Sequence, residues 1–213
     1  KSIISDSNER GEGEHKIMKY ISNLPKNTTS VIYGLDADLI MLSMFQKSNI
    51  YLLRETTNYN IEKTESPYIY CNINILKKSL IATIKKDFYK ISNSTILYDY
   101  LFMCFFIGND FIINTPSINI RYGGLDYLLE NYHKLQEMFS GTFYLIDDKK
   151  NIFLDNLQLF IKELSFNELD KIKEINNIRK NQQKKYKRIY SDILNKYKPT
   201  SIDDINNQKI NID

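Results

Sequence analysis

The sequence has 213 residues, of which 42% are hydrophobic and 26% charged. This composition is typical of a soluble globular protein with a substantial core and excludes a wholly disordered chain. The longest apolar run, residues 101–107, is far shorter than the ~20 residues that a membrane-spanning helix needs. With two cysteines and two histidines, neither a disulfide framework nor a structural zinc site is expected.

The first half of the chain alternates between strand and helix patterns. Apolar residues recur at helical spacing from Ile17 to Leu24, so residues 14–24 are predicted to form a helix that ends before Pro25. A second helix is predicted over residues 35–45. The predicted strands are residues 1–5, 29–34, 49–55 and 66–73. Strands that alternate with helices favour an α/β protein built on a parallel sheet.

The second half is predicted to be helical. An amphipathic helix is expected over residues 74–91 and a largely apolar one over residues 94–108. Gly123 and Gly124 open another helix that runs to residue 135, and further helices follow from residue 152. Residues 171–198 hold ten Lys or Arg and two acids, so the rest of the chain is net acidic although the whole carries +3. The acids of that remainder are where the chemistry is sought.

Five acidic residues stand at the ends of predicted elements. Ligands of parallel α/β sheets bind beyond the carboxyl ends of the strands, and crowded carboxylates resist ionisation unless a cation neutralises them. Mg²⁺ and Mn²⁺ prefer such oxygen ligands, and a pair of these ions supports phosphodiester hydrolysis. Gly11 and Gly13 are expected to let the loop before the first helix turn tightly. The acids are Glu12, Glu14, Asp36, Asp38 and Asp110.

Each acidic pair also has a purely structural interpretation. Asp36 and Asp38 could serve as a helix N-cap and a favourable first-turn charge. Glu12 and Glu14 could complement the dipole of the helix that follows them, and Asp110 could belong to a simple turn. The coincidence of all three groups at element ends favours the metal interpretation.

Five motifs of the chain occur in the order and spacing of a known family. They are GEGEHKIM, GLDADLIMLS, YDYLFMCFFIGNDF, PSINIRYGGLDYLL and NLQLFIKELSFNEL. The sequence therefore resembles the 5′→3′ exoribonuclease family of the Xrn/Rat type over residues 1–175.

The resemblance implies a PIN-like, flap-nuclease-like α/β core with a helical C-terminal extension. Residues 1–135 would be the C-terminal portion of the catalytic core, and residues 136–213 the extension with its basic helices. The implied activity is metal-dependent hydrolysis of single-stranded RNA from a 5′-monophosphate end, with release of mononucleotides. Matched motif by motif, the five acids would ligate two Mg²⁺ or Mn²⁺ ions. Asp99 also matches a family acid, for which a structural role is expected.

The departures from the family matter as much. The earliest acids of the family's active site, and the basic pocket that reads the 5′-phosphate, lie in an N-terminal region without counterpart here. We therefore expect either a fragment of a longer nuclease or the partner of a separately encoded N-terminal segment. Two alternatives stay open: an inactive RNA-binding remnant or subunit, and a flap or 5′-DNA nuclease of the same superfold.

Several basic residues are candidates for RNA contact. Tyr186 and Tyr190 are interleaved with lysines and arginines, a pattern that favours phosphate binding with base stacking. The alternative is a solvated helix whose tyrosines and isoleucines pack inward. No membrane partner is expected, and the protein is predicted to be intracellular, cytoplasmic or alternatively nuclear. The RNA-contact candidates are Lys16, Arg121, Lys184, Lys185, Lys187 and Arg188.

Overall fold

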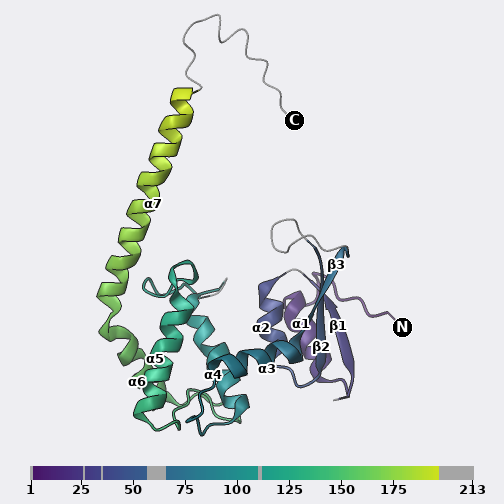
Figure 1. Ribbon diagram of the computed structural model, residues 1–213. Helices are drawn as coiled ribbons and strands as arrows, with labels where there is room; N and C mark the ends of the chain where they lie inside the picture. The colour runs from purple at the N-terminus through teal and green to yellow at the C-terminus, as the bar shows by residue number, and fades with distance from the viewer. Residues whose placement is uncertain (1, 26, 35, 57–65, 110–111, 197–213) are drawn as a thin grey trace, which may run out of the picture.

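The computed structural model describes residues 2–25, 27–34, 36–56, 66–109 and 112–196. Figure 1 shows a small sheet at one end of the body, a helical group at the other, and one long helix that leaves the helical group. In chain order the elements are α1 (Gly13–Ser22), β1 (Thr29–Tyr33), α2 (Ala37–Met44), β2 (Asn49–Glu55), β3 (Tyr68–Asn72), α3 (Ile73–Ile84), α4 (Asn93–Cys104), the 3₁₀ helices η1 (Phe105–Ile107) and η2 (Ile120–Tyr122), α5 (Gly124–Met138), α6 (Leu154–Phe166) and α7 (Glu168–Lys196).

The sheet has the order β1-β2-β3. β1 pairs with β2 in parallel, whereas β2 pairs with β3 in antiparallel fashion. The mixed α/β class expected for a PIN-like core is confirmed, and the sheet contains the expected parallel pair, but β3 is antiparallel to β2. Two consecutive strands can pair in parallel only if a crossover segment, usually a helix, returns the chain to the same end of the sheet. The sequence between β2 and β3 carries no helical pattern.

Other local predictions differ from the structure. Residues 2–5 form no strand. Ile3 and Ile4 are exposed, and no strand of the described residues pairs with them. In α1 the buried side chains are Met18 and Ile21, so the face that packs inward is rotated from the one that Ile17 suggested. The helix predicted for residues 74–91 ends at Ile84, where the next residue turns to an extended conformation.

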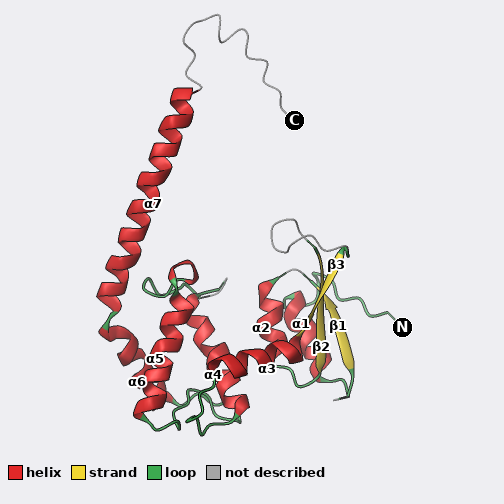
Figure 2. Ribbon diagram, viewed as in Figure 1, coloured by secondary structure: helices red, strands yellow, loops and turns green. Residues whose placement is uncertain are grey.

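The core has two parts that meet at α4. One part lies between the sheet and helices α1–α3 and contains Ile32, Ile50 and Leu101. The other lies among α4, α5 and α6 and contains Tyr132 and Phe160. Figure 2 shows the same division, with the strands confined to one end of the body. The predicted domain division at residue 135 falls inside α5 and stays a prediction. No helix of the described residues is long and apolar enough to span a membrane.

Asp99 is the centre of a buried hydrogen-bond network that ties α4 to the rest of the helical group. Its carboxylate accepts from the backbone N–H groups of Leu145 and Ile146, at 2.9 and 2.8 Å. It also accepts from the hydroxyl of Tyr132 on α5, at 2.7 Å. The amide of Gln136 donates to Tyr132 Oη and to the carbonyl of residue 143. These contacts agree with the structural role expected for Asp99.

This network predicts a pH-dependent stability. Burial raises the pKa of the Asp99 carboxyl to about 7 from the ordinary value of 3.8, against the three donors that lower it. The folded state therefore holds this proton to a higher pH than the unfolded chain. The stability that Asp99 contributes is complete below about pH 4 and is lost as the pH rises through about 7.

We expect Asp99→Asn, which keeps the shape and cannot ionise, to remove this pH dependence. Urea unfolding of both proteins from about pH 5 to 8 measures it, with the exposed Asp126→Asn as the control variant. Over this pH range, the free energy of unfolding of the unmodified chain should fall relative to that of Asp99→Asn. The free energy of unfolding of Asp126→Asn should change with pH in parallel with that of the unmodified chain. Parallel curves for all three proteins would contradict the assignment.

Candidate active site

Helices α1 and α2 begin at the same end of the sheet. β1 runs into α2 after a three-residue connection, and α1 precedes β1, so both helices run opposite to β1. α1 and α2 pack against each other, and both lie on the side of the sheet that Figure 1 shows covered by helices. Their N-termini therefore lie near the carboxyl end of β1, where a ligand of an α/β sheet is expected.

Four of the predicted acids occupy these two helix starts in the same pattern. Glu12 is the N-cap residue of α1 and Glu14 lies in its first turn. Asp36 is the N-cap residue of α2 and Asp38 lies in its first turn. Neither N-cap side chain makes a capping hydrogen bond. The capping interpretation of Asp36 is therefore not the arrangement in the structure, although all four charges suit the positive ends of the helix dipoles.

The loop before α1 is held by local contacts. Gly11 has φ +109°, which only glycine adopts without strain, whereas Gly13 is helical and has open space beside it. Only the first of the two glycines therefore has the predicted turn role. His15 Nδ1 lies 3.3 Å from the carboxylate of Glu12. Lys16 Nζ donates to the carbonyl of residue 6 at 3.0 Å and so braces the loop. Its contact with RNA stays a prediction.

The acids do not converge into a complete metal site within the part of the chain that the structure describes. There, no group of three or more His, Cys, Asp or Glu side chains lies close enough to hold a metal ion. Asp110 lies outside the described residues. Among its described neighbours, Gly108 has φ +90°, and the backbone N–H of Ile112 donates to Asn109 Oδ1 at 2.8 Å. The five-acid ligand set stays a prediction.

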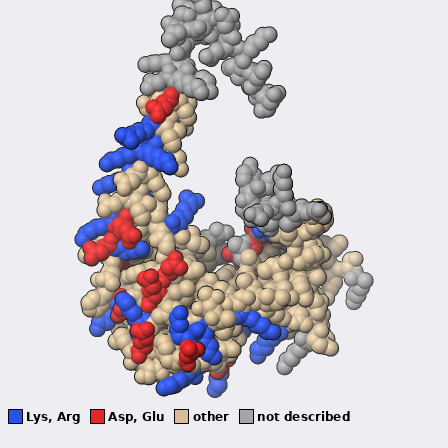
Figure 3. All heavy atoms as spheres, viewed as in Figure 1, with Lys and Arg blue, Asp and Glu red and all other residues tan. Residues whose placement is uncertain are grey.

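The basic candidates other than Lys16 lie in the helical half of the molecule. Lys184, Lys187 and Arg188 are exposed on α7 and line one open hollow with residues 181 and 191. Lys185 lines the same hollow. Figure 3 shows blue side chains gathered along this helix.

Near the base of α7, the guanidinium of Arg179 lies over the ring of Tyr122, 5.3 Å from its centre. Tyr122 belongs to η2, next to the exposed candidate Arg121. Sequence reasoning missed Tyr122, whose only signal is its place beside that arginine.

The alternative interpretation of α7, in which its tyrosines and isoleucines pack inward, is wrong for the outer part of the helix. The side chains concerned are all exposed, and they are Tyr186, Ile189, Tyr190 and Ile193. The basic and the apolar residues of this segment are therefore both accessible.

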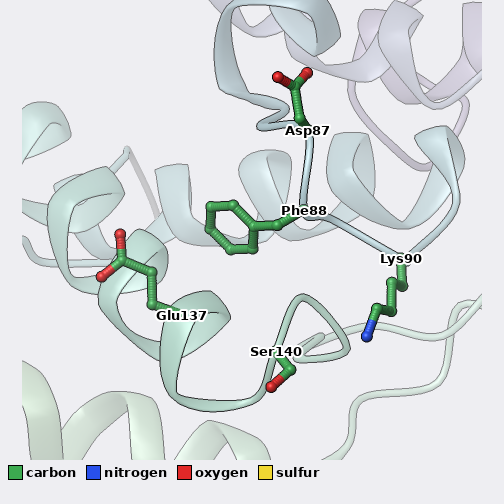
Figure 4. A pocket seen from close by; sticks show the side chains of 5 residues that line it. All are labelled: Asp87, Phe88, Lys90, Glu137 and Ser140. Atoms are coloured by element: carbon green, nitrogen blue, oxygen red, sulfur yellow. The ribbon is translucent and has the colours of Figure 1, made fainter.

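A second hollow lies apart from all predicted site residues. Figure 4 shows Asp87, Phe88 and Lys90 after α3 facing Glu137 and Ser140 at the end of α5. Its charged groups are of mixed sign, and the segments are tied by a hydrogen bond from the backbone N–H of Lys90 to the carbonyl of residue 141. Nothing in its lining matches the acid-rich chemistry at the helix starts.

Comparison with known proteins gives a consistent result over both halves. A family model described as the XRN 5′-3′ exonuclease N-terminus matches residues 1–56, which include the four acids at the helix starts. A model described as the Xrn1 helical domain matches residues 90–211.

Curated relatives of the same kind match most of the chain. A 5′-3′ exoribonuclease 2 from Arabidopsis thaliana is 31% identical over 88% of the chain and 22% of its own length. One from Candida glabrata is 32% identical over 84% of the chain and 21% of its length. A homolog from Drosophila melanogaster is 31% identical over 77% of the chain and 23% of its length. The chain thus spans about a fifth of the length of these relatives, and it belongs to the Xrn family of 5′→3′ exonucleases.

Proposed function

We propose that this chain is part of a divalent-metal-dependent 5′→3′ exoribonuclease that degrades single-stranded RNA from a 5′-monophosphate end. The observation that carries the proposal is the placement of four acids, Glu12, Glu14, Asp36 and Asp38, at the adjacent starts of α1 and α2. The names of the curated relatives support the reaction class. Hydrolysis of the phosphodiester bond would release mononucleotides one at a time.

The residues fit a hard divalent cation by their chemistry. All four described acids offer carboxylate oxygens at an accessible surface, and the N-cap pair makes no capping bond that an ion would have to break. When bound, such ions lower the pKa of a coordinated water and neutralise the charge that develops on phosphate oxygens. The residues that would hold Mg²⁺ or Mn²⁺, two ions in all, are Glu12, Glu14, Asp36, Asp38 and Asp110.

A second candidate function is an RNA-binding subunit without activity of its own. The absence of a group of three convergent acids in the described residues favours it. In that case a further segment, N-terminal in the same polypeptide or separately encoded, would have to supply the remaining ligands. The two candidates differ in turnover and not in RNA binding.

The basic side of α7 is the proposed RNA track. Its four basic residues, Lys184, Lys185, Lys187 and Arg188, are all exposed there, and the phosphate backbone supplies most of the affinity in binding of this kind. Single-stranded RNA is thus the expected substrate of the enzyme and the expected ligand of the subunit.

The ligand assignment predicts that Asp38→Ala weakens Mn²⁺ binding without unfolding the protein. The matched control is Asp155→Ala, because Asp155 is exposed and holds a first-turn position in α6 as Asp38 does in α2. Both variants lose a similar charge–dipole contribution, about 0.3–1 kcal/mol. Titration followed by the paramagnetic signal of Mn²⁺ should separate them. Equal Mn²⁺ affinity in both variants would remove Asp38 from the ligand set.

Activity itself is tested on RNA labelled at its 3′ end and bearing a 5′-monophosphate, with Mg²⁺ or Mn²⁺ present. We expect mononucleotide release that Asp36→Ala/Asp38→Ala reduces by more than the ~10–100-fold that loss of an outer-shell partner costs. A DNA strand of the same sequence and an RNA with a 5′-hydroxyl serve as control substrates. RNA binding without metal-dependent release would instead establish the inactive subunit.

The RNA track predicts a change in salt dependence. Replacing its four basic residues by Gln should lower the slope of log affinity against log salt concentration by up to about 3, at about 0.7 for each phosphate of a single strand that is no longer neutralised. Fluorescence anisotropy with a labelled RNA measures both slopes. An unchanged slope would exclude α7 from the track. The control removes the same charge from four other exposed lysines, Lys78, Lys86, Lys90 and Lys162.

A further inference from the structure

Arg54 is a cation near the carboxyl end of β2 that has no partner in the described part of the chain. The Nε atom of its guanidinium is buried and makes no hydrogen bond there. The rest of the guanidinium forms no hydrogen bond or ion pair with another described residue. Arginine stays protonated in proteins, so this group keeps its charge and its donors. A buried donor without an acceptor is rare in folded proteins and calls for an explanation.

The sheet places Arg54 at the same end as the acidic helix starts. Ile50 and Leu52 of the same strand are buried in the part of the core that lies under α1–α3. Arg54 follows at the same two-residue period, so its side chain leaves the sheet on that side. Because β2 runs parallel to β1, the carboxyl end of β2 is also the end at which α1 and α2 begin. Arg54 and the four described acids therefore share one side and one end of the sheet.

The neighbours of Arg54 in the sheet cannot supply its missing acceptor. On one side stands Gly34, which has no side chain and whose backbone N–H donates to the carbonyl of Leu53 at 3.1 Å. The space over this glycine is taken by Leu39, whose Cδ1 atom a Cβ at that position would overlap. On the other side the ladder partner of Arg54 is Ile69. The acceptor for the guanidinium therefore has to come from outside this apolar surrounding.

We propose that Arg54 binds the phosphate of the first linkage of the RNA, next to its 5′-terminal nucleotide. The proposal rests on the proposed function and adds a substrate-binding cation to a site whose other members are acids. Ions held by those acids would act on the phosphate that is cleaved, and Arg54 lies at the same end of the sheet. A guanidinium matches two phosphate oxygens with paired hydrogen bonds. It would also offset the repulsion between the phosphate and the carboxylates.

The test is a cycle between this side chain and the charge of one phosphate. Two short single-stranded RNAs bear a 5′-monophosphate and differ only at the first linkage, which is a phosphodiester in one and an uncharged methylphosphonate in the other. Both have a 2′-O-methyl group on the first nucleotide, which keeps the neutral linkage stable. Fluorescence anisotropy with Ca²⁺ in place of Mg²⁺ measures their affinities for the unmodified chain and for Arg54→Gln.

We expect Arg54→Gln to bind the phosphodiester RNA about 10–100-fold more weakly than the unmodified chain does, as befits hydrogen bonds to a charged group. The methylphosphonate RNA should bind both proteins equally, because the charge that Arg54 contacts is already absent. Arg54→Lys keeps the charge but loses the paired donors. It should still prefer the phosphodiester RNA, by a smaller factor than the unmodified chain.

Two controls separate contact with the substrate from a structural role. Lys162→Gln removes a positive charge from an exposed position on α6, so any loss of affinity should be the same for the two RNAs. Arg54→Gln should unfold at the same urea concentration as the unmodified chain, because the side chain has no described partner to leave behind. Circular dichroism follows the unfolding of each protein.

Three results would overturn the proposal. If Arg54→Gln loses the same factor of affinity for both RNAs, the guanidinium acts elsewhere than at this linkage. If it loses none for either RNA, the guanidinium touches no phosphate. If the loss disappears only when the 5′-monophosphate is replaced by a hydroxyl, Arg54 reads the terminal phosphate instead. All three are measurements of binding, so a chain that releases no mononucleotides, which would defeat the proposed enzyme, still gives a result for Arg54.

Discussion

The buried carboxylate of Asp99 is the interaction on which the arrangement of the two halves depends. It sits in the middle of α4, and α4 is the helix that both parts of the core share. Its oxygens satisfy two backbone N–H groups of the segment after α5 and the hydroxyl of Tyr132 on α5. Without those acceptors, three buried donors would lose their partner, each at a cost of about 1–3 kcal/mol. This contact therefore helps to fix the position of the helical group relative to the sheet. It thereby also helps to fix the position of α7 relative to the acids.

The acids at the starts of α1 and α2 show a different use of charge. Asp99 has a structural use, and its buried environment favours the protonated form. Glu12 and Asp36 stand at N-cap positions yet leave the cap unmade, although a capping side chain contributes about 1 kcal/mol to a helix. The two N-termini are thereby left with paired carboxylates at the surface and with dipoles that favour negative charge. The caps left unmade give up local stability at both helix starts, and this supports the proposal that these carboxylates serve a cation.

Local patterns in the sequence were sufficient to predict most helices and strands. They were not sufficient to predict which elements pair or pack with one another. The strand predicted at residues 49–55 is β2 without any shift, because its apolar alternation and its bounding residues are local signals. The direction of β3 and the exposure of Ile3 depend on neighbours that no local pattern names. The same limit applies to the site. The motifs placed four acids at helix starts, and the structure has them there. Whether their side chains converge depends on tertiary contacts, and within the described residues no group of three or more metal-ligating side chains comes together. Asp110 lies outside those residues.

Helix α7 carries both basic and apolar side chains on its exposed part. Sequence reasoning offered two interpretations of this segment, phosphate binding or a solvated helix with its apolar residues turned inward. In the structure Lys184, Arg188, Ile189 and Ile193 are all exposed. Inward packing of the apolar residues is therefore not the arrangement in the structure. The basic residues Lys184 and Arg188 remain accessible to a phosphate backbone, which supplies most of the affinity when a protein binds single-stranded RNA.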